Sequence, residues 1–379
     1  MKDNYILTAE SVTAGHPDKL CDTIADSVLD ACLKEDPNAR VACEVLATVG
    51  KILVAGELRT TASPDVEAIV RQTVRNAGYD CNYNVEVRLH TQSPDIAGAV
   101  DGETLGAGDQ GIMYGYACWE TVELLPAPVV LANRITSLLT TCREEKLISG
   151  IGPDGKTQVS VQYAFGVPER VDTIVISCQH DADKDPDELR EELRRLVIAR
   201  ACHDVRIDEQ TKILINPSGR FVLGGFEADT GLTGRKLMVD TYGGLVPHGG
   251  GALSGKDGTK VDRSGAYMAR YVAKNIVAAG LADVCTVSLA YAIGQTEPVA
   301  VEIDTQESGY YDDAFLTEAV RRVFDFTPAG MIRALDLDKP FFAEVCNNCH
   351  FMHPQAAWEQ TDKAEKLRMA CAELEDERT

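Results

Sequence analysis

The sequence predicts an α+β fold of three structurally related domains, each built from a mixed sheet and helices. Its 379 residues exceed one ordinary core, since domains average roughly 150 residues. Hydrophobic residues make up 45% and charged residues 25%, which is typical of a folded globular chain. Patterns typical of strand hairpins and of helices then alternate in three rounds along the chain, and each round is expected to form one domain.

The first round begins with a short strand at residues 5–7, followed by a helix that Pro17 opens. Apolar residues recur every four positions in this helix and form one stripe: Leu20, Ile24, Val28 and Cys32. Residues 40–47 and 52–58 are rich in Val, Ile and Leu. Because Gly50 and Lys51 separate them, they predict a hairpin.

A second helix of this round is predicted with Ser63 as its cap, Pro64 as its first residue and Gly78 at its end. Residues 95–111 are expected to form a loop. The second round comprises a helix at 129–146, strands at 158–165 and 173–178, a helix capped near Asp185, and a strand at 212–215. The third comprises a helix from Asp262 to Gly280, strands at 286–293 and 299–303, and a helix at 314–324.

The charge of the chain restricts its partners. It carries 37 basic and 59 acidic residues, a net charge of −22, which repels nucleic-acid backbones and anionic membranes. We therefore expect neither nucleic acid nor a membrane as a partner, and any site for a polyanion must be built locally. The twelve cysteines are scattered singly, and neither a signal peptide nor a stretch of roughly 20 apolar residues is apparent. These features predict a cytoplasmic protein.

One candidate anion site is the motif Gly15-His16-Pro17-Asp18-Lys19, where a loop becomes a helix. A helix N-terminus offers unpaired N–H groups and the positive end of a dipole. His16 and Lys19 add donors, and Asp18 could bind a metal that bridges phosphate oxygens. Taken alone, the motif also fits an ordinary helix start, and both interpretations stay open at this point.

A glycine-rich tract at residues 219–258 is the stronger candidate. Glycines let backbone N–H groups close around phosphate oxygens. Cationic side chains are interleaved with these glycines or follow them: Arg220, Arg235, Lys236, Lys256 and Lys260. Asp229 and Asp262 add carboxylates for Mg²⁺ or for an amine. So many cations in an acidic chain favour a phosphate site over a series of solvated turns.

Familiar nucleotide and nucleophile motifs do not fit. Residues 250–256 match G-x-x-x-x-G-K, but Asp257 stands where a P-loop needs Ser or Thr, and no strand precedes it. Residues 106–111 match G-x-G-x-x-G without a preceding strand, and Leu131 occupies the ribose-binding spacing. Neither G-x-S-x-G nor H-E-x-x-H occurs. We therefore expect the substrate itself to supply the nucleophile, or the enzyme to orient a water.

The segment Cys346-Asn347-Asn348-Cys349-His350 has the spacing of a haem attachment site, and His353 nearby suggests zinc. The missing export signal argues against haem. We interpret these residues as packed or surface side chains, and zinc binding stays open as an alternative.

Ten stretches resemble, in order, the S-adenosylmethionine synthetase family of the bacterial and eukaryotic type. They are ESVTAGHPDK (10–19), ARVACE (39–44), QSPDI (92–96), GAGDQG (106–111), GRFV (219–222), TGLTGRK (230–236), VDTYGG (239–244), HGGGALSGKD (248–257), KVDRS (260–264) and WEQTDK (358–363). The resemblance spans nearly the whole chain. It implies three α+β domains around a pseudo-threefold axis, here predicted at 1–100, 106–226 and 228–366. It also implies a homodimer or homotetramer with active sites shared between two subunits.

The resemblance also implies the site residues. The catalytic residues would be His16, Lys156, Arg235 and Lys256. The ATP site would comprise His16, Asp154, Lys156, Arg220, Phe221, Asp229, Arg235, Lys236, Ala252 and Lys256. The methionine pocket would comprise Glu57, Gln92, Asp229, Lys260 and Ile293, with Asp109 near the site across the interface. Asp18 and Asp262 would bind Mg²⁺, about two ions per site, and Glu44 would bind K⁺.

The implied reaction joins ATP to L-methionine. The thioether sulfur attacks C5′ of ATP and displaces triphosphate, which is then hydrolysed to pyrophosphate and phosphate. Cations at the departing triphosphate would supply the largest catalytic effect, and His16 would donate near the breaking bond. The loop that gates the site in this family is short here, which leaves rate and substrate tolerance open. A non-catalytic relative that binds ATP, or one that uses another nucleophile, is the alternative.

Overall fold

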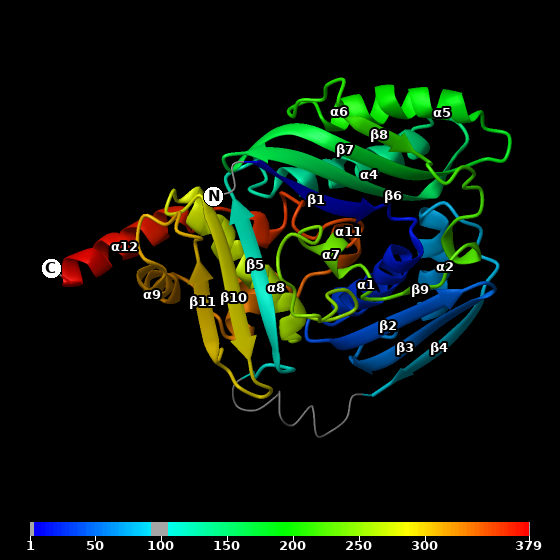
Figure 1. Cartoon of the computed structure of the whole chain (residues 1–379). Helices are drawn as coiled ribbons and strands as arrows, with labels where there is room; N and C mark the ends of the chain where they lie inside the picture. The colour runs from blue at the N-terminus through cyan, green and yellow to red at the C-terminus, as the bar shows by residue number, and fades with distance from the viewer. Residues whose placement is uncertain (1–3, 92–104, 379) are drawn as a thin grey trace.

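The computed structural model describes residues 4–91 and 105–378, which form two mixed sheets and one antiparallel sheet, with helices packed on one face of each. Figure 1 shows the three sheets around the middle of the molecule, with helix α12 reaching outward at the C-terminus. The predicted α+β class with three sheet-and-helix units is therefore confirmed. Among the described helices, none is long and apolar enough to cross a membrane.

The first sheet has the order β1-β6-β7-β8, and β7 and β8 are its only parallel pair. Its strands are β1 (Asn4–Val12), β6 (Ile151–Ala164), β7 (Val167–His180) and β8 (Lys212–Ile215). Helix α4 (Ala127–Glu144) and helix α5 (Pro186–Leu193), which continues through a π-helical turn (Arg194–Ile198) into α6 (Ala199–Ala201), share one apolar core with this sheet.

The second sheet has the order β4-β3-β2-β9. Its strands are β2 (Arg40–Thr48), β3 (Lys51–Arg59), β4 (Asn84–His90) and β9 (Gly231–Leu232). Helix α1 (Pro17–Glu35) packs on this sheet, and α2 (Val66–Asn76) packs beside it. The predicted apolar stripe of α1 is confirmed, because Leu20, Ile24, Val28 and Cys32 are all buried. The predicted hairpin is confirmed as β2 and β3.

The third sheet has the order β11-β10-β5. Its strands are β5 (Gly111–Cys118), β10 (Val284–Tyr291) and β11 (Ala300–Asp304). Helices α8 (Val261–Ala278), α9 (Asp313–Val323) and α12 (Ala364–Arg378) pack on or beside it. The core of this unit is continuous with that of the second sheet.

Short elements connect these units. They are α7 (Leu237–Asp240), α10 (Pro328–Ala334), α11 (Phe342–Val345) and the 3₁₀ turns Gly225–Glu227 and Ala357–Glu359. The glycine-rich tract at 219–258 consists mainly of loops, with only β9, α7 and one 3₁₀ turn as regular structure. The loops of this tract therefore connect β8 of the first sheet, β9 of the second sheet and α8 of the third unit.

Each sheet contains one strand that comes from a different part of the sequence than its other strands. β1 precedes the second sheet in sequence but pairs with β6 of the first, β5 pairs with β10 of the third, and β9 pairs with β2 of the second. The predicted boundaries at 100, 106, 226 and 228 divide the chain linearly, and they stay a prediction. The observed strand exchange ties the three units into one molecule.

Three local predictions are corrected. Helix α2 starts at Val66 with Asp65 as its cap, two residues later than the predicted cap Ser63, because the Asp65 carboxylate accepts the Ala68 N–H at 3.0 Å. The first strand is longer than residues 5–7, since β1 pairs with β6 over its full length. Strand β5 is absent from the predicted elements, and it starts at Gly111, the last residue of the predicted loop.

Candidate active site

The first group of predicted residues gathers where α1 begins. His16 is the N-cap residue of α1, and its Nδ1 accepts a hydrogen bond from the Asp18 N–H at 3.2 Å. Burial, followed by the nearby charge of Lys236, lowers the pKa of His16 to about 4. The ring is therefore neutral at pH 7 and keeps one N–H to donate. The motif is an ordinary helix start and also brings His16 among charged side chains.

Asp18 ties the glycine-rich tract to α1. The Asp18 side chain is nearly fully buried, and its Oδ1 accepts the Leu232 N–H at 3.0 Å. Its Oδ2 lies 2.6 Å from Nζ of Lys236, and Nε of Arg235 lies 3.7 Å from Oδ1. The side chain of Lys236 is 17% exposed and that of Arg235 is 50% exposed, so both cations border the site.

Lys19 does not belong to this group, contrary to the prediction from the motif. Its side chain is fully buried, and Nζ lies 2.6 Å from Asp240 and 3.3 Å from Asp22. Burial alone would lower the pKa of Lys19, but these two carboxylates more than offset it, and the pKa is raised. Lys19 therefore stabilises the core and offers no donor to a ligand.

Lys156 approaches the first group from the first sheet. It lies on β6, and its Nζ forms an ion pair of 2.6 Å with Glu10 on the neighbouring strand β1. The side chain of Lys156 is 43% exposed. Its charge contributes to the lowered pKa of His16, which indicates that the two residues are neighbours.

Asp154 and Asp229 complete the first group. Asp154 is buried, and its Oδ2 accepts the Gly225 N–H at 2.9 Å. Burial, opposed by backbone hydrogen bonds from Gly225 and Gly155 and supported by the charges of Asp229 and Asp18, raises the pKa of Asp154 to about 6. Asp229 is exposed and accepts the Thr230 N–H at 2.8 Å. Both carboxylates thus lie along the turn that leads to Lys236.

Arg220 and Phe221 follow β8 at the edge of the same sheet. The Phe221 N–H donates to Nε2 of His180 at 3.1 Å, and its carbonyl accepts the His180 N–H at 2.9 Å. Because His180 closes β7 opposite the start of β6, this pairing holds Phe221 at the end of the sheet that carries Asp154. Arg220 is exposed beside it.

The second group lies at the end of the glycine-rich tract. Nζ of Lys256 and Oδ2 of Asp262 form an ion pair of 2.6 Å, and both side chains are mostly buried. Gly251 passes directly over this pair, since a Cβ added there would lie 2.0 Å from Oδ1 of Asp262. A glycine is therefore required where the loop approaches the carboxylate.

Glu44 and Glu57 stand next to the second group. Lys256 forms a β-bridge with Ala42 on β2, and Glu57 on β3 pairs with the same Ala42 in register. Partial desolvation raises the pKa of Glu44, Lys256 opposes this shift, and Glu57 adds to it. Glu57 lies 3.5 Å from Nε2 of His90. Glu44 therefore lies close enough to Lys256 and to Glu57 for both charges to act on it.

Lys260 is held by a residue that the sequence did not single out. Asp257 is buried, and its carboxylate contacts Nζ of Lys260 at 2.5 Å and accepts the Val41 N–H at 2.7 Å. Asp257 served only to reject a P-loop, although its spacing of three residues from Lys260 could have indicated the pair. Glu10, the partner of Lys156, was likewise given no role.

The remaining predicted residues lie around the two groups, except one. Ala252 touches the turn before Arg235, because a Cβ on Gly234 would lie 2.6 Å from its methyl group. Ile293 is 47% exposed and directly precedes Gly294, whose N–H donates to Ala107 at 2.8 Å. Asp109 is exposed near that contact. Gln92 lies outside the described residues.

Within one chain the two groups attach to β2 at different points, although Ala252 beside the second group approaches Gly234 of the first. Both attach to β2, where Leu232 pairs with Leu46 and Lys256 bridges to Ala42. Four strand residues correspond to about 13 Å. Each group therefore offers one carboxylate, Asp18 or Asp262, that is paired with its own lysine.

The metal prediction can be compared with these carboxylates. Among residues 4–91 and 105–378, no three His, Cys, Asp or Glu side chains are gathered as a metal site would require. Mg²⁺ commonly takes one or two protein carboxylates and completes its shell with water and phosphate. Single carboxylates at Asp18 and Asp262 fit that manner of binding.

The cysteine and histidine cluster near the C-terminus belongs to the core. Cys346, Cys349 and His350 are fully buried. Sγ of Cys349 lies 2.9 Å from the Thr241 carbonyl, and Nδ1 of His350 lies 2.7 Å from the Tyr267 hydroxyl. Burial lowers the pKa of His353. These side chains are engaged in packing and hydrogen bonds.

Family models match almost the entire chain in three consecutive segments. The N-terminal domain of S-adenosylmethionine synthetase matches residues 4–102, the central domain matches 104–221, and the C-terminal domain matches 223–360. The three matches follow one another in the order of the family. The chain therefore belongs to the S-adenosylmethionine synthetase family, and is a methionine adenosyltransferase that makes S-adenosylmethionine from ATP and methionine.

Proposed function

We propose that the two charged groups form one active site in which the methionine sulfur attacks C5′ of ATP and displaces triphosphate. A thioether is already nucleophilic, so the attack requires no general base. The observation that carries this proposal is the pair of groups at α1 and at the end of the glycine-rich tract. Each holds a lysine ammonium group paired with one aspartate, Lys236 with Asp18 and Lys256 with Asp262, and lies next to glycine-rich backbone.

The residues of the first group act on the leaving triphosphate. Lys156, Arg235 and Lys236 stabilise the negative charge that grows on it, which is usually the largest catalytic effect. His16 is neutral and donates a hydrogen bond near the breaking bond. Asp154 and Asp229 orient the nucleotide, with Phe221 against the adenine, Arg220 beside it and Ala252 at the turn.

The residues of the second group add the remaining contacts. Lys256 binds the triphosphate, and Glu57, Lys260, Asp229 and Ile293 hold methionine, together with Gln92. Asp18 and Asp262 would each hold Mg²⁺, about two ions per site, and Glu44 would hold K⁺. Bound Mg²⁺ would neutralise phosphate charge during displacement and during the following hydrolysis to pyrophosphate and phosphate.

We further propose that two chains share each site in a homodimer, which could pair again into a homotetramer. Three features support this arrangement. The two groups lie about 13 Å apart along β2 of one chain. The faces of the sheets that helices leave uncovered carry exposed apolar side chains, for example Ile6, Leu46 and Ile112. Lys156 and Glu44 lie on those same faces, so pairing the faces would bring the groups of two chains together.

The predicted domain boundaries and the cytoplasmic location belong to the same proposal. All twelve cysteines are unpaired, which suits a reducing compartment.

The test incubates the protein with ATP, methionine, Mg²⁺ and K⁺ and follows S-adenosylmethionine, phosphate and pyrophosphate together. We expect equal amounts of all three, and only when methionine is present. ATP binding without a sulfonium product would favour a non-catalytic relative. ATP consumption without dependence on methionine would instead favour another nucleophile.

A further inference from the structure

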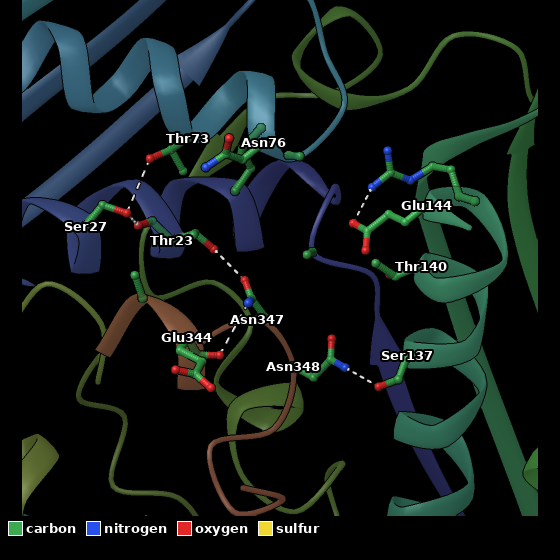
Figure 2. Close-up of a pocket in the computed structure, with 15 residues that line it drawn as sticks. Thr23, Ser27, Thr73, Asn76, Ser137, Thr140, Glu144, Glu344, Asn347 and Asn348 are labelled. Carbon is green, nitrogen blue, oxygen red and sulfur yellow. Dashed lines mark hydrogen bonds and ion pairs between the residues drawn. The ribbon is translucent and has the colours of Figure 1, made fainter. Parts of the chain in front are cut away.

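A polar cavity of about 480 Å³ lies where helices α1, α2, α4 and α11 meet. Its lining includes none of the residues of the two charged groups. Figure 2 shows hydroxyl and amide side chains from these helices and from the segment that follows α11 around the cavity. Because one water occupies about 30 Å³ of liquid, the cavity has room for an organic ligand of several heavy atoms.

Four of the hydroxyl groups of the cavity have already used their hydrogens. Thr23, Ser27 and Thr140 each donate to a carbonyl one turn earlier in their own helix, at 2.9, 2.7 and 3.2 Å. Thr73 donates to the Ser27 hydroxyl at 3.3 Å. Their oxygen lone pairs remain as acceptors toward the cavity.

The charged side chains of the lining add a net negative charge. Arg143 is engaged with Glu144 at 3.0 Å, whereas the Glu344 carboxylate has neither an ion pair nor a hydrogen bond to any residue the structure describes. The charged lining therefore sums to −1, with one cation against two carboxylates. One amide N–H of Asn348 donates to the Ser137 hydroxyl at 2.7 Å, and Asn76, whose Oδ1 accepts from Gln72, adds amide donors to the lining. A ligand that supplies donors and positive charge meets this lining best.

We propose that this cavity is a binding site for a small organic ammonium ion, such as a primary amine or a diamine. An ammonium group carries three donors and no acceptor, which complements hydroxyl oxygens without free hydrogens and an unpaired carboxylate. The net charge of −22 raises the local concentration of cations further. An occupant would lie against Ala14, two residues before His16, so it would contact the segment that carries the candidate active site.

Isothermal titration calorimetry of the full chain with 1,4-diaminobutane tests the proposal, with butane-1,4-diol as the uncharged probe of similar shape. We expect one diamine per chain, and binding of the diol weaker by about tenfold or more. Glu344→Gln should weaken the diamine about tenfold, and Thr140→Val about fivefold, because each removes an acceptor while keeping the volume. The matched control is Glu373→Gln, which neutralises an exposed carboxylate on α12.

Three results would overturn the proposal. The first is an absence of saturable diamine binding, and the second is diol binding as tight as that of the diamine. The third is equal affinity in Glu344→Gln and Glu373→Gln. If affinity instead falls on Glu57→Gln, the diamine occupies the second charged group, and the cavity is not its site. Thr140 lies on α4 and Glu344 on α11, so the two variants probe different helices of the cavity. If one variant misfolds, the other still tests the proposal.

Discussion

Lysine side chains in this chain serve two purposes, and burial separates them. Lys19 is fully enclosed between Asp22 and Asp240, where no ligand can reach its ammonium group. Lys236 and Lys256 are 17% and 18% exposed, and each is paired with a single carboxylate at the border of a charged group. The ammonium groups of Lys236 and Lys256 are therefore accessible enough to contact the phosphate oxygens of a ligand, whereas that of Lys19 is not.

Lys256→Ala should retain the fold and lose most activity. The side chain is at the border of the core, so the lost packing is small, but the charge that stabilises the departing triphosphate disappears. Removal of one such contact typically lowers kcat by about a hundredfold or more. Steady-state kinetics with circular dichroism and thermal unfolding check both halves of this expectation.

The control for Lys256→Ala is Lys366→Ala, which removes an exposed lysine from α12. Its kcat should equal that of the parent. If Lys256→Ala turns over as fast as this control, the role assigned to the end of the glycine-rich tract is wrong.

His16 should titrate well below an ordinary histidine. Burial and the charge of Lys236 lower its pKa from 6.5 to about 4 in the folded chain. Because the unfolded chain binds the proton first as the pH falls, this residue costs no stability above pH 6.5. The cost grows as the pH falls toward 4 and then levels off.

Histidine ring signals in an NMR pH titration check this value, with His16→Gln identifying the signal. The same variant should flatten the stability curve between pH 6.5 and 4. A His16 signal that titrates near 6.5 would show that the ring is hydrated and distant from Lys236.

At the scale of elements, the N-terminus of α2 offers a direct comparison of sequence pattern with structure. The pattern Ser63-Pro64 predicts a cap at Ser63, whereas the Asp65 carboxylate accepts the Ala68 N–H at 3.0 Å. Asp65→Ala should therefore destabilise the chain by about 1 kcal/mol, as N-cap replacements typically do. Ser63→Ala is the matched control and should change little. Urea unfolding distinguishes the two, and the opposite ranking would restore Ser63 as the cap.

Elements with a local signature could be predicted from the sequence. The apolar stripe of α1 and the hairpin β2–β3 depend on residues that are close together in the chain. Strand β5 has no such signature. Its Gly115 is required because α8 crosses it closely, where a Cβ would lie 2.0 Å from the Ala269 carbonyl carbon. Its partner β10 lies far along the sequence, so neither reason for its composition is visible locally.

The same distinction applies to the candidate site. The motifs that resemble the family contain most of the residues that the structure gathers, because a ligand contacts short runs of backbone. Two ion-pair partners, Asp240 and Glu10, could not be predicted from local sequence patterns, because the fold brings them to their lysines from distant positions. Lys19 was expected to face the ligand, but its partner Asp240 is 221 positions away and reaches it only through the fold. Glu10 was missed because its role depends on the pairing of β1 with β6.

At the scale of the whole molecule, the arrangement of the two groups demands an explanation. Strand exchange among the three sheets joins the units within one chain, yet the two groups remain about 13 Å apart along β2. Either the substrates bridge this distance within one chain, or a second chain supplies the missing group. The uncovered sheet faces favour the second arrangement, since they expose Leu46 and Ile112 beside the charged residues.

Mixing two inactive variants decides between these arrangements. Lys236→Ala damages only the first group and Lys256→Ala only the second. If each site takes one group from each chain, half of the randomly paired dimers are mixed, and each mixed dimer holds one intact site. Refolding the two variants together should then restore about a quarter of the parent activity. Mixing Lys236→Ala with Arg235→Ala should restore none, because both changes damage the first group and every site keeps one of them. If the first mixture also stays inactive while forming dimers, each site is complete within one chain, and the proposed sharing is wrong.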